Sequence, residues 1–141
     1  MKKLFLFATL CVFAFGTKAQ DMNFEETVKY IKNKVVNDNS YYLDKSGWSY
    51  AYVIINLEPT KSGDITFTLG SGPKTKLNLF ELKHGNEEGI IVLNQRIYLY
   101  TSKTDYYTID HIQSNAEAER ISKALIHLRS LCTKEKDPFD N

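Results

Sequence analysis

The side chains that most often carry chemistry are few in this chain and widely spaced. The three histidines are His84, His111 and His127, and no two have the i, i+4 spacing that places two zinc ligands on one helix. Asp110 and His111 are adjacent in a predicted strand, where successive side chains point to opposite faces. The pattern therefore predicts no metal site.

Nucleophilic and acid–base catalysis have no recognisable constellation either. The chain has no Gly-x-Ser-x-Gly elbow, and the spacing of His127 and Cys132 places them about 140° apart on a helix. Glu25-Glu26 falls in a predicted first helical turn, and Glu87-Glu88 in a Gly-flanked loop, so neither pair should face a second carboxylate across a cleft. Gly70–Lys76 lacks the form of a phosphate-binding loop. We expect no catalytic residue and no cofactor.

Aromatic side chains are the best remaining indication of function. The chain has 9 Tyr, 8 Phe and 1 Trp, and Tyr suits recognition surfaces because its ring supplies contact area with a polar tip. Tyr50 and Tyr52 are predicted to share one strand face, and Tyr98 and Tyr100 another, with Trp48 near a strand end. These five residues form the candidate recognition surface. The alternative is that cross-strand Tyr pairs simply support a sheet.

Two amphipathic segments predict a helix at each end of the mature chain. Asn23 and Glu26 have the spacing of a capping box, and Ser114 and Glu117 repeat it. Apolar residues follow each box at helical spacing. The first stripe is Phe24, Val28, Ile31 and Val35, and the second is Ala118, Ile121, Leu125, Leu128 and Cys132.

Between the helices, residues 41–112 read as six or seven strands joined by turns. In the segment 49–58, alternation assigns Ala51, Val53, Ile55 and Leu57 to one face. In 76–83 the apolar phase shifts, which suggests a bulge or burial on both faces. Residues 90–101 form either a hairpin around Asn94-Gln95 or one long bent strand. We predict an α+β fold, with a bent antiparallel sheet or partly closed barrel, an N-terminal helix and a C-terminal capping helix.

The N-terminal segment has the form of a secretory signal peptide. Two lysines precede the apolar run Leu4–Phe15, and the small residues Thr17 and Ala19 precede a cleavage site before Gln20. The run of about 12 residues is shorter than the roughly 20 needed to cross a bilayer. We predict a signal peptide over 1–19, one domain over 20–132, a flexible polar tail over 133–141, and a periplasmic or secreted location without a transmembrane anchor.

Charge excludes some partners. The chain has 18 basic and 17 acidic residues; without Lys2, Lys3 and Lys18 of the signal, 15 basic residues face the 17 acidic ones, a net of −2. A near-neutral domain has no general attraction to nucleic acid or to anionic membranes. A single Cys, Cys132, remains after cleavage, so no intramolecular disulfide can form.

The order of elements resembles the pleckstrin-homology-like barrel over about residues 41–132, where strands in series are closed by one helix with the pattern Ala118-x-Arg120-Ile121-x-x-Ala124-Leu125-x-x-Leu128. Lipid-binding members of that class carry several basic residues in the first strand–strand turn, whereas residues 58–64 contain only Lys61. The resemblance therefore does not extend to phosphoinositide binding. The helix ending and the Gln after the cleavage site also resemble small exported Bacteroidota proteins of unassigned function.

These observations favour an exported, non-enzymatic binding or protein-interaction module whose partner is an unknown protein or small molecule. One alternative is a small-ligand carrier with an apolar cavity. The other is a small enzyme, which would require the fold to bring His84, Asp110 and His111 together.

Overall fold

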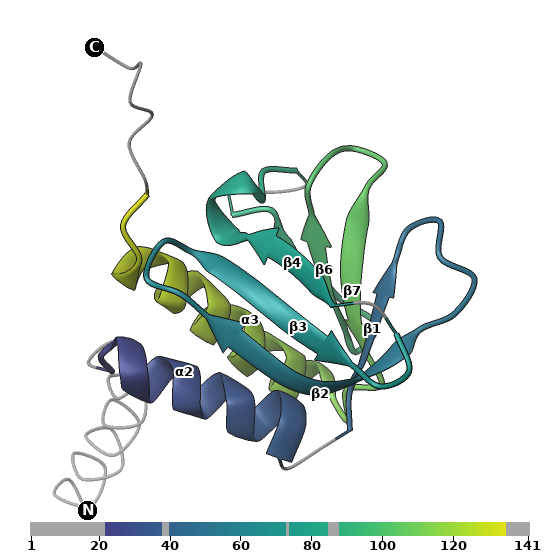
Figure 1. Ribbon diagram of the computed structural model, residues 1–141, viewed down its shortest axis with the longest axis horizontal. Helices are drawn as coiled ribbons and strands as arrows, with labels where there is room; N and C mark the ends of the chain where they lie inside the picture. The colour runs from purple at the N-terminus through teal and green to yellow at the C-terminus, as the bar shows by residue number, and fades with distance from the viewer. Residues whose placement is uncertain (1–21, 38–39, 73, 85–87, 135–141) are drawn as a thin grey trace, which may run out of the picture.

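A computed structural model describes residues 22–37, 40–72, 74–84 and 88–134. The predicted signal peptide and residues 135–141 of the predicted tail lie outside the described residues. Within the ranges that the structure describes, two α-helices flank seven strands (Figure 1). The helical elements are α2 (Phe24–Lys32), the π-helical η1 (Asn33–Asn37), the 3-10 turn η2 (Leu79–Glu81) and α3 (Asn115–Leu131). The strands are β1 (Tyr42–Lys45), β2 (Tyr52–Pro59), β3 (Asp64–Leu69), β4 (Thr75–Asn78), β5 (Ile90–Leu93), β6 (Arg96–Tyr100) and β7 (Tyr106–Asp110).

The strands form one antiparallel sheet in the order β4-β3-β2-β1-β7-β6-β5. The sheet does not close, because β4 and β5 are its two ends. Helix α3 crosses one face of the sheet and α2 lies beside it (Figure 1). The predicted α+β class, with a helix at each end and a bent antiparallel sheet, is confirmed. The likeness to the pleckstrin-homology-like barrel stays a prediction.

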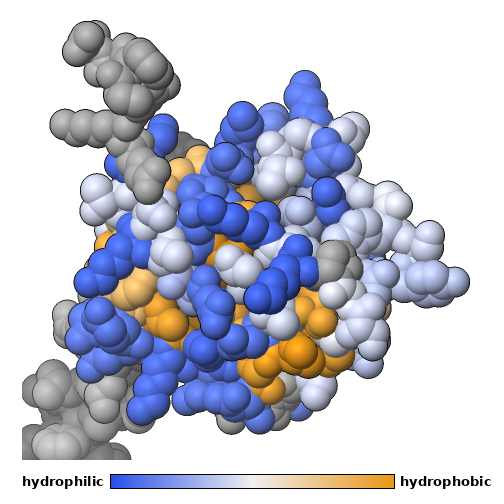
Figure 2. Space-filling model, in the orientation of Figure 1, coloured by the Kyte–Doolittle hydropathy of each residue, from blue (hydrophilic) through white to orange (hydrophobic). Residues whose placement is uncertain are grey.

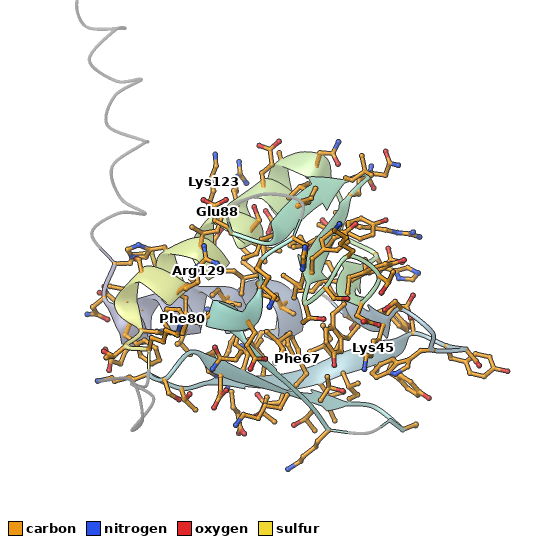
Figure 3. All side chains as sticks on the ribbon, turned by 90° about the horizontal axis from the view of Figure 1, so that it is seen from above. Lys45, Phe67, Phe80, Glu88, Lys123 and Arg129 are labelled. Carbon is orange, nitrogen blue, oxygen red and sulfur yellow. The ribbon has the colours of Figure 1, made fainter. Side chains whose placement is uncertain are left out.

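The core lies between the inner face of the sheet and the two helices. Phe67 of β3 points into this layer (Figure 3). Hydrophobic burial of this kind provides most of the favourable free energy of folding. The strands contribute Leu43, Ile54, Leu57, Ile65, Phe67, Ile97, Leu99 and Ile109, and the helices contribute Ile31, Ala118, Ile121, Leu125 and Leu128.

Both helices begin at the predicted caps. The Asn23 side chain accepts from the Glu26 N–H at 3.0 Å, and the Glu26 carboxylate accepts from the Asn23 N–H at 3.0 Å. The Ser114 hydroxyl accepts from the Glu117 N–H at 3.2 Å. These bonds satisfy donors that have no partner within a helix. The expected stripe of α3 is buried as far as Leu128, whereas Cys132 is a half-buried residue just past the helix end.

The alternation predicted for residues 49–58 is wrong, because strand β2 contains a bulge. Its register against β3 shifts between Ile54 and Asn56, so one extra residue enters the strand. A bulge moves the following side chains to the opposite face. Ile54 and Leu57 are therefore the buried pair, and Ile55 is 52% exposed. Most of the surface in Figure 2 is hydrophilic, and the larger of its apolar patches lie in the lower half of the view.

Two other uncertainties of the sequence are resolved. The phase shift in 76–83 arises because β4 ends at Asn78, whose side chain accepts from the Phe80 N–H at 2.9 Å and begins the 3-10 turn η2. It is neither a bulge nor burial on both faces. Residues 90–101 form a hairpin, and Asn94 and Gln95 have φ of 50° and 62°, as a tight type I′ turn requires.

Candidate functional site

Three tyrosines form a cluster on the outer face of the sheet. Tyr98 and Tyr100 are two residues apart in β6, and Tyr106 of β7 is the cross-strand partner of Tyr100. Their ring centroids are 6.1 Å apart for Tyr98 and Tyr100, 5.6 Å for Tyr98 and Tyr106, and 5.3 Å for Tyr100 and Tyr106. These separations fall in the range of favourable aromatic contacts. All three side chains are half-buried. We call Tyr98, Tyr100 and Tyr106 the tyrosine cluster.

Strand alternation points the tyrosine cluster away from the helices. Ile97 and Leu99, which alternate with Tyr98 and Tyr100, are 0% exposed and belong to the core against which α3 packs. Side chains on the odd and even positions of a strand point to opposite faces. The cluster therefore occupies the sheet face that neither α2 nor α3 covers.

Charged and aromatic groups extend this face toward the other end of β7. The Arg96 Nε lies 2.9 Å from the Asp110 carboxylate, and the same carboxylate accepts from the His111 N–H at 2.7 Å. The hydrogen bond to Tyr98 and, to a smaller extent, the one to Asp110 raise the pKa of Arg96. The His111 ring lies 4.6 Å from that of Tyr42 on β1. The tyrosine cluster thus has a charged, hydrogen-bonded border.

The five candidate recognition residues do not form one surface. Tyr98 and Tyr100 are in the tyrosine cluster. The Trp48 ring instead packs edge-on against two other rings, with centroid separations of 5.4 Å to Tyr52 and 6.3 Å to Tyr107. Tyr52 pairs with the buried Leu43 of β1, which places this second group on the core side of the sheet.

Tyr50 belongs to neither group. It precedes β2, in the β1–β2 connection, and is 75% exposed. The expected pairing of Tyr50 with Tyr52 on one strand face is therefore wrong, because the strand begins only at Tyr52. Tyr106 is the member that sequence reasoning did not select. The short turn at Lys103–Asp105 places it opposite Tyr100, so the turn was the signal that could have found it.

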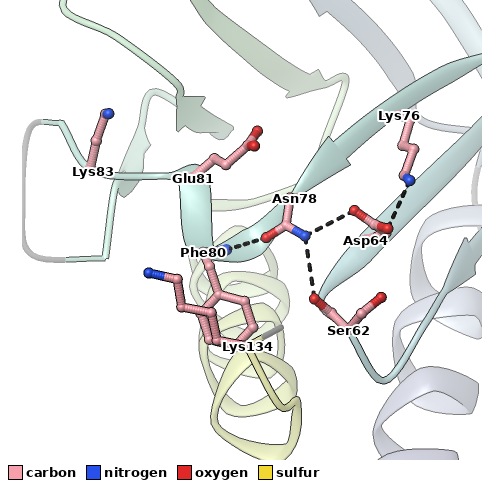
Figure 4. Close-up of a pocket in the computed structure, with 8 residues that line it drawn as sticks. All are labelled: Ser62, Asp64, Lys76, Asn78, Phe80, Glu81, Lys83 and Lys134. Carbon is pink, nitrogen blue, oxygen red and sulfur yellow. Dashed lines mark hydrogen bonds and ion pairs between the residues drawn. The ribbon is translucent and has the colours of Figure 1, made fainter. Parts of the chain in front are cut away.

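A cleft of about 480 Å³ lies where η2, the β2–β3 hairpin and the chain after α3 meet (Figure 4). Its lining is mainly polar and charged, unlike the apolar cavity that a carrier would need. The lining residues are Ser62, Asp64, Lys76, Asn78, Phe80, Glu81, Lys83 and Lys134. Sequence reasoning selected none of them, since they come from three separate stretches of the chain, 62–64, 76–83 and residue 134.

His127 and Cys132, which were considered as a catalytic pair, contact different backbone carbonyl groups. His127 Nε2 lies 2.8 Å from the Met22 carbonyl oxygen, and the Cys132 thiol donates to the Thr60 carbonyl oxygen at 3.5 Å. Burial raises the pKa of the Cys132 thiol, which disfavours the nucleophilic thiolate. Within the described parts of the chain, no three His, Cys, Asp or Glu side chains are grouped so that they could hold a metal ion.

The chain matches no protein-family model, and neither a curated protein nor a solved structure is similar to it at a significant level. Neither of the two described helices is both long and apolar enough to cross a membrane.

Proposed function

We propose that the protein is an exported, non-enzymatic module that binds another protein through the tyrosine cluster and its Arg96–Asp110 border. The observation that carries the proposal is the contact of three half-buried Tyr rings on the sheet face opposite the helices. The predicted signal peptide supports a role outside the cytoplasm.

The composition of this face suits a protein partner. Tyr and Arg are enriched among the residues that contribute most to binding between proteins, and they act best at the centre of a contact patch. Arg96 is already oriented by Asp110 at 2.9 Å, and the Tyr rings hold one another in place. Fewer side-chain rotamers would therefore be lost on binding, which favours affinity.

Site-specific photocrosslinking in the organism of origin tests the proposal. A photoreactive phenylalanine analogue replaces Tyr98 or Tyr100 in separate chains, and Glu58, which is exposed on β2, in the control. We expect a discrete adduct from the two cluster positions and none from position 58. No adduct, or the same adducts from all three positions, would remove the tyrosine cluster as the recognition surface.

Variants then measure the contribution of the rings to affinity for the captured protein. A Tyr98→Ala, Tyr100→Ala chain should bind at least about 30-fold more weakly, since central aromatic residues typically contribute about 2 kcal/mol or more. Tyr50→Ala is the matched control, because it removes a more exposed phenol from the β1–β2 connection. Circular dichroism confirms that each variant is folded. An equal loss in the control would contradict the assignment.

A further inference from the structure

We propose that the cleft between η2, the β2–β3 hairpin and the chain after α3 is a second binding site, for a small organic anion that carries an aromatic or apolar group. The site is independent of the tyrosine cluster, none of whose members lines it. Its volume of about 480 Å³ lies in the range of sites for small molecules, about 300–1,000 Å³.

One side of the cleft is a fixed set of polar groups. The Asn78 amide donates to Asp64 Oδ1 at 2.9 Å and to the Ser62 carbonyl oxygen at 3.3 Å, and its oxygen accepts from the Phe80 N–H at 2.9 Å. Lys76 Nζ lies 2.8 Å from the Asp64 carboxylate. These bonds satisfy one another, so this side of the cleft has shape but little charge left to attract a ligand.

Phe80 supplies an apolar wall at a defined position. Its backbone is held by the Asn78 cap, and its ring lies against Gly63, where an added Cβ would be 2.9 Å from two ring atoms. Gly63 has a φ of +88°, which a side chain rarely adopts. The ring is half-buried, so part of it remains in contact with solvent.

Two lysines supply the positive charge. The ammonium groups of Lys83 and Lys134 form no ion pair with any residue that the structure describes. Figure 4 shows both on the side of Phe80 away from Asp64, with the Glu81 carboxylate apart from them.

Backbone hydrogen bonds hold the bases of these lysines. The Lys83 N–H donates to the Tyr100 carbonyl oxygen at 3.2 Å. The residue before Lys134, Thr133, donates its N–H to the Lys61 carbonyl oxygen at 2.8 Å. Among the described residues, the lining of the cleft therefore contains two lysines outside any ion pair and one aromatic ring.

This combination favours one ligand chemistry. A carboxylate or phosphate would interact with the two ammonium groups, and an attached aromatic or apolar group would cover the Phe80 ring. An inorganic anion would use the charges alone, and a neutral aromatic compound the ring alone. Both should bind more weakly than a molecule that has the two parts joined.

Amide chemical-shift titration of the full chain tests the site with phenyl phosphate and phenylacetate as probes. We expect saturable shifts at Ser62, Asn78 and Phe80. Inorganic phosphate and benzyl alcohol should each bind at least about tenfold more weakly, and added salt should weaken the anions. The two probes also distinguish a phosphate from a carboxylate preference. No saturable shift from either probe up to about 10 mM would overturn the proposal.

Lysine variants show whether the two ammonium groups carry the binding. Lys83→Met and Lys134→Met should each weaken the preferred probe by about fivefold, as expected for one unit charge about 4 Å away in water-like surroundings. Lys103→Met, in the exposed β6–β7 turn, is the matched control and should bind normally. Equal affinity in all three variants would overturn the proposal. The Tyr98→Ala, Tyr100→Ala chain should bind normally, which separates this site from the proposed function.

Discussion

Gly89 is the position at which the fold depends most directly on the absence of a side chain. It has a φ of +66°, and a Cβ added there would lie 2.3 Å from the Lys83 nitrogen and 2.5 Å from the Leu82 carbonyl carbon. Both are backbone atoms, so no rotamer change can relieve the overlap. Gly47 has a comparable φ of +85°, but an added Cβ would meet nothing within 4 Å. The two glycines therefore form a matched pair.

Gly89→Ala should lower the free energy of unfolding by about 1–4.5 kcal/mol, after an offset of about 0.4–1 kcal/mol because alanine restricts the unfolded chain. The left-handed backbone costs an alanine about 1–2 kcal/mol, and displacing packed backbone costs about 1–3 kcal/mol more. Gly47→Ala has only the first cost, reduced by the same offset of about 0.4–1 kcal/mol. We expect a loss of about 1 kcal/mol there. The difference between the two variants isolates the close approach.

Urea denaturation followed by circular dichroism measures both losses. Amide exchange adds a local readout, because the Gly89 carbonyl accepts from the Tyr100 N–H at 2.8 Å and the Lys83 N–H donates to the Tyr100 carbonyl at 3.2 Å. Both amides should exchange faster in Gly89→Ala and normally in Gly47→Ala. Equal losses of stability in the two variants would refute the reasoning from close approach.

Three further outcomes follow from single contacts. Ser114→Ala removes the cap of α3 and should lower stability by about 1 kcal/mol in urea denaturation; a loss no larger than that of an exposed loop serine would contradict it. Hydrogen bonding and charge from Lys76 lower the pKa of Asp64, so its contribution is present above the unfolded pKa and is lost as the pH falls through the folded value. Asp64→Asn should therefore lose less stability than the wild type between pH 7 and 3; an unchanged pH profile would contradict this. Cys11→Ser leaves Cys132 as the only thiol of the chain. Because burial raises the pKa of that thiol, labelling at pH 8 should be about tenfold slower in the folded chain than in the chain unfolded by urea. Equal rates would show that the thiol is accessible in the folded chain.

The helices were predictable because each carries local signals that tertiary packing did not override. The Asn23 and Ser114 caps begin the helices where the sequence places them. The end of α2 was harder to predict from the sequence. The π-helical turn Asn33–Asn37 keeps Val35 at 1% exposure, and its altered period leaves no distinct mark in a short apolar pattern.

The strand errors have a common physical cause. A bulge or a short turn shifts the alternation by one residue, and only the partner strand shows where that happens. Ile54, Ile55 and Leu57 are all large apolar residues that suit a strand, so residue type does not reveal which of them faces solvent. For the same reason Tyr50 was assigned to a strand that begins two residues later.

The candidate sites were the hardest to predict, because pairings between strands distant in the chain assemble them. The sequence selected Tyr98 and Tyr100 but not Tyr106, whose role depends on the β6–β7 register. The cleft joins Ser62 to Lys134 across 72 residues of chain. No local pattern relates positions that far apart.

The central position of β1 has a consequence for the order of folding. β2–β4 and β5–β7 are successive hairpins with short loops, so each group has mainly local contacts. The four residues of β1 join the groups, since Leu43 pairs with Ile109 of β7. Forming that pairing means closing a loop of more than 60 residues, which is entropically costly and slows folding. The β1–β7 seam is therefore expected to limit the folding rate, after both groups of hairpins have begun to form.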